Sequence, residues 1–234
     1  MQISGSIALV TGANRGIGRH FTQQLLERGA AKVYATARRP EAIDLPGVEK
    51  LRLDITDPGS VEQAAAAASD ATLLVNNAGI ATFTNLVTGD LSKIRSELDT
   101  HFYGTLSMVR AFAPVLGANG GGAILNVLSA LSWFSYDGAN AYAVAKAAEW
   151  SLTNGIRLEL AGQGTLVTGL HLGSADTDMM ASYDGDKIDP ADVVRVALDG
   201  IEAGKIEVLA DERSAYIKAS LANDPSVFYA PSGR

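Results

Sequence analysis

A short apolar run near the start of the chain, residues 7–11, leads directly into a glycine-rich turn, residues 11–18. A helix-forming segment, residues 15–28, follows the turn and is expected to end at Gly29. A second apolar run, residues 32–37, comes next. A strand, a tight turn, a helix and another strand make a βαβ unit, whose two strands lie parallel in one sheet. The opening of the chain therefore constrains the fold to a parallel sheet covered by helices.

The same alternation of short apolar runs and amphipathic segments continues to the end of the chain. The predicted strands are residues 7–11, 32–37, 50–54, 72–76, 123–128, 166–172 and 205–210. The predicted helices are residues 15–28, 58–68, 90–116, about 142–160 and 190–203; Asp57–Pro58 and Asp189–Pro190 are typical helix starts. The pattern predicts an α/β fold: a doubly wound parallel sheet of about seven strands with helices on both faces. We expect one domain over residues 1–229 and a short loose tail, residues 230–234.

Composition excludes several classes of protein. Hydrophobic residues make up 47% of the 234 residues and charged residues 19%, which is typical of a globular chain. The formal net charge of −7 argues against nucleic acid as a partner, and the absence of cysteine excludes thiol chemistry. The N-terminus lacks the pattern of a secretory signal, and no apolar run is long enough to cross a membrane. We expect a soluble, cytoplasmic protein without a membrane partner.

The glycine-rich turn TGANRGIG has the composition of a phosphate-binding loop. Gly12, Gly16 and Gly18 allow the backbone to turn tightly, to approach a phosphate and to pack the following helix against the strand. The helix that starts there supplies amide donors and a favourable dipole. A glycine-rich turn alone could be only a turn, but its place after the first strand of a βαβ unit favours a dinucleotide site.

The end of the second predicted strand indicates which dinucleotide binds. NAD sites usually place a carboxylate there, whereas a site for NADP needs arginine for the additional phosphate. Arg38 and Arg39 follow the strand, no acid stands at its end, and Arg15 in the glycine loop adds a third cation. These arginines could also be a solvated helix start. The missing acid favours NADP(H) as the cofactor.

Tyr142 and Lys146 lie four residues apart in the segment YAVAK and therefore share one helix face. A phenol beside a fixed cation loses its proton more easily, which suits a general acid/base. Ser129 lies thirteen positions upstream of Tyr142. Taken singly, each of these residues is better explained as a structural residue; together with the glycine loop, they predict a catalytic group.

In these motifs the chain resembles the short-chain dehydrogenase/reductase family, in its compact single-domain branch with a Rossmann-type fold. TGANRGIG resembles the family's glycine loop, LDITD contains the acid that contacts adenine, and NNAG, residues 76–79, resembles the motif after the fourth strand. The resemblance implies that Ser129, Tyr142 and Lys146 are catalytic. It implies a cofactor site formed by Gly12, Asn14, Arg15, Gly16, Ile17, Gly18, Arg38, Asp54, Ile55, Asn77, Ala78, Gly79, Tyr142, Lys146, Gly173, Ala175 and Thr177.

Two positions depart from the family pattern. His101 stands where the family usually has an asparagine that belongs to a water-linked proton path ending at the lysine. His101 could replace that asparagine, or it could fill a kink in the helix without any role in proton transfer. Leu172 stands where the family has proline, which removes a backbone constraint beside the nicotinamide.

The resemblance implies hydride transfer between NADP(H) and a carbonyl or alcohol substrate, without a metal. Tyr142 would be the acid/base, Lys146 would lower the tyrosine pKa and bind ribose, and Ser129 would orient the substrate oxygen. Candidates for an apolar substrate wall are Leu131, Trp133, Phe134, Met179, Met180 and Tyr183, of which Trp133 and Phe134 could equally be core or interface residues. His171 and Asp178 are expected to be structural.

Two alternative functions remain open, and the resemblance also implies an oligomeric state. A catalytically quiet NADP-binding sensor or regulatory protein is the main alternative to an oxidoreductase. Dehydratase or epimerase chemistry on a nucleotide sugar ranks last, because the chain has no room for a further substrate domain. The family implies a homodimer or homotetramer through the two long helices, where Phe102, Met108, Phe112 and Trp150 are candidates for the interface or for the core.

Overall fold

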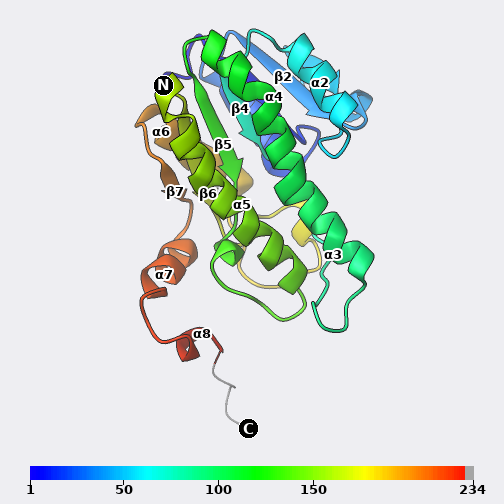
Figure 1. Cartoon of the computed structure of the whole chain (residues 1–234), viewed down its shortest axis with the longest axis vertical. Coiled ribbons are helices and arrows are strands. Elements are labelled where there is room, and N and C mark those ends of the chain that lie inside the picture. The colour runs from blue at the N-terminus through cyan, green and yellow to red at the C-terminus, as the bar shows by residue number, and fades with distance from the viewer. Residues whose placement is uncertain (230–234) are drawn as a thin grey trace.

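Seven strands form one parallel sheet at the centre of the computed structural model, which describes residues 1–229 (Figure 1). The strands are β1 (Ile7–Val10), β2 (Lys32–Ala37), β3 (Glu49–Arg52), β4 (Leu73–Asn76), β5 (Ala123–Val127), β6 (Leu166–His171) and β7 (Glu207–Leu209). Their order across the sheet is β3-β2-β1-β4-β5-β6-β7, and every neighbouring pair is parallel. All seven predicted strands are confirmed within a few residues. The tail predicted at 230–234 lies outside the described residues.

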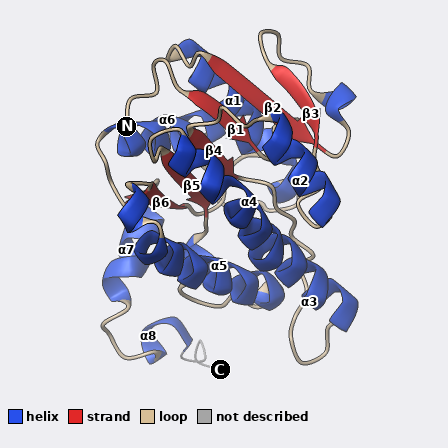
Figure 2. Cartoon of the chain, turned by 45° about the horizontal axis from the view of Figure 1, so that its top comes forward, coloured by secondary structure: helices blue, strands red, loops and turns tan. Residues whose placement is uncertain are grey.

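Helices cover both faces of the sheet (Figure 2). They are α1 (Gly16–Glu27), α2 (Pro58–Ala67), α3 (Leu91–Leu98), α4 (Thr105–Ala118), α5 (Asn140–Glu159), α6 (Pro190–Glu202), α7 (Glu212–Ser220) and α8 (Ser226–Tyr229). The aspartates Asp57 and Asp189 cap α2 and α6 by accepting a backbone N–H, as predicted. Helices α1 and α6 share one apolar core with the sheet, and α2, α4 and α5 share the other. The doubly wound architecture is confirmed.

Alternate residues of each central strand enter opposite cores. In β1, Ala8 and Val10 face the core under α1 and α6, while Leu9 faces the core under α4. In β4, Leu73 and Leu74 divide in the same way. This alternation explains why the strands read as continuous apolar runs, since both faces of a parallel sheet are buried.

The predicted helix over residues 90–116 is helical throughout but is not α-helical along its whole length. It consists of α3 and α4 joined by a π-helical turn, η2 (Asp99–Gly104). Asp90 caps its start by accepting the Ser92 N–H at 2.8 Å. A π turn inserts one residue into the helical repeat and rotates the side chains that follow it. Here it holds His101 almost completely buried, at 1% exposure.

The C-terminal helices α7 and α8 were not predicted. Asp211 caps α7 by accepting the Ser214 N–H at 2.8 Å, and its other oxygen accepts the Gly173 N–H at 2.7 Å. Phe228 in α8 stacks on Phe134, with ring centroids 5.9 Å apart. Helices α7 and α8 therefore pack against the loops that follow β5 and β6.

The strand order reverses between β1 and β4, where connections leave the sheet in opposite directions. In doubly wound sheets a ligand site lies at such a switch point, outside the carboxyl ends of the strands. The site described next occupies this position.

Candidate active site

A cavity of about 1160 Å³ lies at the carboxyl ends of the strands. It is lined by the loops after β1, β2, β3, β4, β5 and β6, by α3 and η2, and by the start of α5. Every site residue predicted from the sequence lines this cavity except Gly18. A side chain at Gly18 would place its Cβ 2.2 Å from the Gly12 carbonyl oxygen, so this glycine permits close packing of helix and loop.

The glycine loop and the segment after β4 are bound to each other. Gly12 and Gly16 adopt φ values of 67° and 53°, which favour glycine. Thr11 Oγ1 accepts the backbone N–H groups of Asn77 and Ala78, both at 2.9 Å, and Asn77 Nδ2 donates to the Thr11 carbonyl at 2.9 Å. No side chain caps the start of α1, so its first amide groups remain able to bind an anion.

The end of β2 presents two cations to the cavity. Arg38 and Arg39 both line it and are exposed, and neither has a carboxylate within 4.0 Å among residues 1–229. Arg15 instead contacts Asp178 across the cavity, with Nη1 and Oδ2 3.3 Å apart. Burial would raise the pKa of Asp54, but bonds from Thr56 and the nearby arginines hold it below its usual range. The cavity thus has a cationic end at β2.

Ser129, Tyr142 and Lys146 lie on one side of the same cavity. Ser129 follows β5 and caps the short helix η3 (Ala130–Ser132) by accepting the Leu131 N–H at 3.1 Å. Tyr142 and Lys146 come from the first turns of α5, and Lys146 Nζ lies 5.7 Å from the Tyr142 ring centroid. The structure therefore brings the three predicted catalytic residues together.

The pKa of Tyr142 is raised above its ordinary value, whereas the sequence predicted that Lys146 would lower it. Burial raises the pKa of the Tyr142 phenol and outweighs the lowering by the Lys146 charge. The charges of Glu149 and Glu97 raise it further. Lys146 acts with the predicted sign, but its effect is smaller than that of the buried surroundings.

Two buried carboxylates near Lys146 were missed by the sequence reasoning. Lys146 Nζ donates to Glu149 Oε2 and to the Val127 carbonyl, both at 2.7 Å. Glu97 is completely buried and lies on the other side of His101. The available signal was the position of Glu149 three residues after Lys146, and of Glu97 four residues before His101, on shared helix faces.

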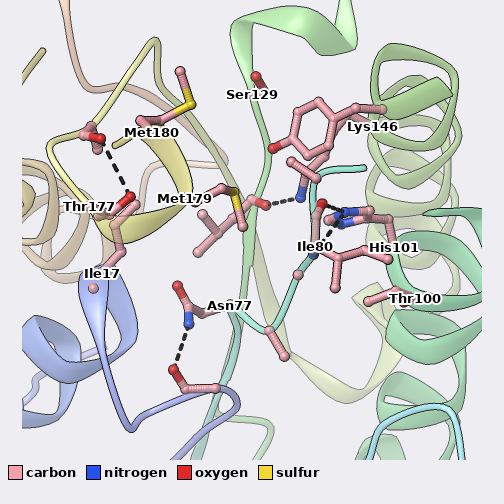
Figure 3. Close-up of a pocket in the computed structure, with 18 of the residues that line it drawn as sticks. Ile17, Asn77, Ile80, Thr100, His101, Ser129, Lys146, Thr177, Met179 and Met180 are labelled. Carbon is pink, nitrogen blue, oxygen red and sulfur yellow. Dashed lines mark hydrogen bonds between the residues drawn. The ribbon is translucent and has the colours of Figure 1, made fainter. Parts of the chain in front are cut away.

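The segment after β6 forms the opposite wall, where Figure 3 shows Thr177, Met179 and Met180 across the cavity from Ser129 and Lys146. Leu172, in place of the family's proline, is anchored through its carbonyl, which accepts the Ala130 N–H at 2.8 Å. Ala175 makes a parallel bridge with Ile188. These backbone contacts hold the segment after β6 against the loop after β5 and against Ile188.

The predicted apolar wall is confirmed as cavity lining for Leu131, Phe134, Met179, Met180 and Tyr183. The prediction was wrong for Trp133, which does not line the cavity. Its indole stacks on His171, with ring centroids 3.8 Å apart, and meets Trp150 edge-on. Lining residues that the sequence reasoning did not name include Phe83, Tyr136, Ser182 and Arg213.

His171 contacts the backbone of Ser129. Its ring is completely buried, and Nδ1 lies 3.1 Å from the Ser129 carbonyl oxygen. Since a carbonyl can only accept, Nδ1 carries the hydrogen. Burial lowers the pKa of His171 to about 4. This residue is structural, as expected, and is neutral near pH 7.

Within residues 1–229 no group of three or more histidine, aspartate and glutamate side chains is arranged to hold a metal ion. In the same part of the chain, none of the helices combines the length and apolar character needed to span a membrane.

Comparisons with known proteins agree on one protein family. The family model for short chain dehydrogenase matches residues 6–187. A short chain dehydrogenase from Burkholderia cenocepacia, solved in complex with NADP, is 39% identical and covers 98% of both chains with a TM-score of 0.94. An uncharacterized oxidoreductase of Staphylococcus saprophyticus is 26% identical over 86% of this chain and 93% of its own length. An NADPH-dependent 1-acyldihydroxyacetone phosphate reductase of Schizosaccharomyces pombe is 33% identical over 74% of this chain and 61% of its own.

Proposed function

The chain belongs to the short-chain dehydrogenase/reductase family, and from this premise we propose that it is an NADP(H)-dependent oxidoreductase acting on a carbonyl or a secondary alcohol. The observation that carries the proposal is the shared cavity. The glycine loop and Arg38 lie at one end of it, and Ser129, Tyr142 and Lys146 lie at the other. A nucleotide held by the first group would bring its nicotinamide ring within reach of the second.

The lining residues fit an NADP molecule. Gly12 leaves a space in the glycine loop that a side chain would fill. A Cβ at this position would lie only 3.0 Å from Ala78 Cα. The uncapped start of α1 and the arginines after β2 would bind the phosphates, and Asp54 with Ile55 would contact the adenine. Gly173, Ala175 and Thr177 would hold the nicotinamide carboxamide. The bound cofactor supplies or accepts the hydride.

Tyr142 would donate a proton to the carbonyl oxygen during reduction and take one from the alcohol during oxidation. Its phenol belongs to a half-buried side chain on the cavity wall, beside the fixed Lys146 ammonium. Ser129 would donate a hydrogen bond to the same substrate oxygen, since its Oγ accepts the Leu131 N–H and its own proton remains available. Lys146 would bind the ribose and stabilise the phenolate.

The wall favours an apolar or aromatic ketone, aldehyde or alcohol as substrate. Phe83, Phe134, Met179 and Tyr136 contribute apolar and aromatic side chains to the lining of the cavity. The Schizosaccharomyces pombe relative is an NADPH-dependent 1-acyldihydroxyacetone phosphate reductase, which supports a carbonyl compound as the substrate class. This assignment rests on the chemistry of the lining.

We further propose a homodimer through the faces of α4 and α5. A shallow apolar groove there is lined by Phe102, Leu106, Leu152 and Ile156 among others. Of the residues suggested earlier for this interface, Met108 and Phe112 are completely buried in the core and are unavailable. Phe102 and Leu106 remain half-buried on the surface of the monomer.

The function is tested by following NADPH and NADH consumption with a panel of ketones, aldehydes and diketones, and the reverse reaction with secondary alcohols. The proposal predicts turnover with NADPH on apolar members of the panel. Tight NADPH binding without turnover on any compound would instead support the quiet NADP-binding protein.

A further inference from the structure

Four ionisable side chains are packed together beside Tyr142. They are Glu97 from α3, His101 from η2, and Lys146 and Glu149 from α5. Their exposures are 0%, 1%, 4% and 2%. His101 also contacts the Tyr142 ring edge-on, with centroids 5.2 Å apart. The mechanism above uses only Lys146 of these four.

The His101 ring lies between the two carboxylates. Its Nε2 is 3.4 Å from Glu97 Oε2, and its Nδ1 is 3.7 Å from Glu149 Oε2. Nε2 also lies 2.8 Å from the Ile80 carbonyl oxygen and 3.4 Å from the Ile80 backbone nitrogen, two contacts that require opposite roles of Nε2 (Figure 3). The shorter contact is to the carbonyl, which can only accept, and it places a hydrogen on Nε2.

The remaining carboxylate oxygens already have donors. Glu97 Oε1 accepts the Thr82 N–H at 2.6 Å, and Glu149 Oε1 accepts the Thr105 hydroxyl at 3.1 Å. Glu97 Oε2 and His101 Nδ1 have no hydrogen-bond partner within the described residues. Both carboxylates are therefore held as acceptors that face the histidine.

An ionised carboxylate can only accept, so a neutral His101 would direct the lone pair of Nδ1 at Glu149. It would also leave two buried negative charges opposite the single positive charge of Lys146, and an uncompensated buried charge is costly. With both ring nitrogens protonated, the four side chains carry two positive and two negative charges. The burial and contacts thus favour the doubly protonated ring.

We propose that Glu97, His101, Glu149 and Lys146 form a charge-balanced buried quartet, in which Glu149 is a positioning residue that holds Lys146 and tunes the acidity of Tyr142. This inference rests on the proposed function for the role of Tyr142. Glu149 holds the ammonium between its own Oε2 and the Val127 carbonyl, and it offsets part of the positive charge that Tyr142 would otherwise experience. His101 balances Glu149 in turn.

The groups that face Tyr142 come from each element packed around it. They are Lys146 and Glu149 on α5, Glu97 on α3, His101 on η2 and the Ser129 hydroxyl after β5. Glu149 and Glu97 raise the pKa of Tyr142, in addition to the dominant effect of burial, whereas Lys146 lowers it. Removing the charge of Glu149 should therefore make Tyr142 more acidic, and removing that of His101 should make it less acidic.

The first test is tyrosinate absorbance against pH in the full chain, with the matched Tyr142→Phe spectrum subtracted from each variant. Glu149→Gln should move the Tyr142 transition to lower pH by about one unit, since a neighbouring charge shifts a pKa by about 1 to 3 units. His101→Gln should move it to higher pH. Glu159→Gln removes an exposed charge at the end of the same helix and should leave the transition unmoved.

The second test is the NMR signature of the three histidine rings at pH 7.5. His101, assigned with His101→Gln, should give the signals of a doubly protonated ring in the unsubstituted protein. His171 provides an internal reference for a neutral ring, because its pKa is about 4.

A neutral His101 in the unsubstituted protein, or a Tyr142 transition that Glu149→Gln does not move, would overturn the quartet. Circular dichroism of each variant identifies one that has not folded, and Glu97→Gln then serves as the second variant, with a shift in the same direction as Glu149→Gln. Neither spectroscopic readout needs turnover. A chain that fails every NADPH assay but shows both signatures would contradict the proposed function and leave the quartet intact.

Discussion

Lowering the pH should destabilise the protein through His171, and the structure supplies the magnitude. Burial lowers the pKa of this ring to about 4 in the folded chain, against an ordinary value of 6.5. The unfolded chain therefore takes up the proton more readily than the folded one. The stabilisation by His171 is complete above about pH 6.5 and is lost as the pH falls toward 4.

Each pH unit between the two pKa values corresponds to about 1.4 kcal/mol, so the full loss is about 3 kcal/mol. About 2 kcal/mol of it should be gone at pH 5. The stacked Trp133 indole and the position of Nδ1 against the Ser129 carbonyl keep the ring in its dry site. Its Nε2 is buried and has no hydrogen-bond partner among residues 1–229, and the nearby Glu207 Oε1 is 3.9 Å away, too far to accept a hydrogen bond from an added proton.

The assay is urea unfolding of the unsubstituted chain and of His171→Asn between pH 8 and pH 4.5. Asn can keep a donor toward Ser129 but cannot take up a proton. The free energy of unfolding of the unsubstituted chain should fall by about 2 kcal/mol more than that of the variant between pH 7.5 and pH 5. Carboxylates titrate in both proteins and cancel in this comparison. Parallel pH curves for the two proteins would refute the reasoning, and His171→Gln guards against a local effect of the shorter side chain.

Two further predictions concern the cofactor and the oligomer. Arg38→Ala should weaken NADPH binding by about 10- to 100-fold and leave NADH binding nearly unchanged, because a charge-assisted hydrogen bond is worth about 1.5–3 kcal/mol; equal effects on both cofactors in a fluorescence titration would remove the argument for NADP. Leu106→Arg places a charge in the groove between α4 and α5 and should convert a dimer to monomers in sedimentation velocity. If the dimer keeps its sedimentation coefficient in this variant, the two subunits must meet through another face.

The sheet and the nucleotide end of the cavity could be predicted from local pattern. Strands such as β1 and β4 are buried on both faces and read as apolar runs, and the turn at Gly12 and Gly16 needs the φ values that glycine provides. The aspartate–proline pairs at the starts of α2 and α6 are equally local signals. These elements depend on neighbours within a few positions in the sequence.

The buried carboxylates could not be predicted, because their role depends on packing between distant segments. A glutamate in a predicted helix is normally interpreted as part of a solvent-exposed face. Glu149 is buried only because α5 packs against η2, which the sequence does not reveal. The π turn that buries His101 has no local signature in the sequence. Only the folded chain brings Glu97 and Glu149 to opposite sides of one imidazole.

Trp133 illustrates the same limit at shorter range. It lies four residues after Ser129, and sequence proximity suggested that it belonged to the substrate wall. The short helix η3 turns the chain between them, so Leu131 faces the cavity while Trp133 packs on His171. The direction of a side chain after a turn depends on that turn's backbone geometry.

The most direct test of the account is to measure NADPH binding and NADPH-dependent turnover side by side in the unsubstituted chain and in Tyr142→Phe, on the best substrate of the panel. Tyr142 is proposed to transfer the proton to or from the substrate oxygen, and general acid–base catalysis typically contributes about 10²- to 10⁴-fold. The account predicts that the variant binds NADPH with nearly unchanged affinity and loses at least about 100-fold in kcat. A variant that retains near-normal turnover would contradict it.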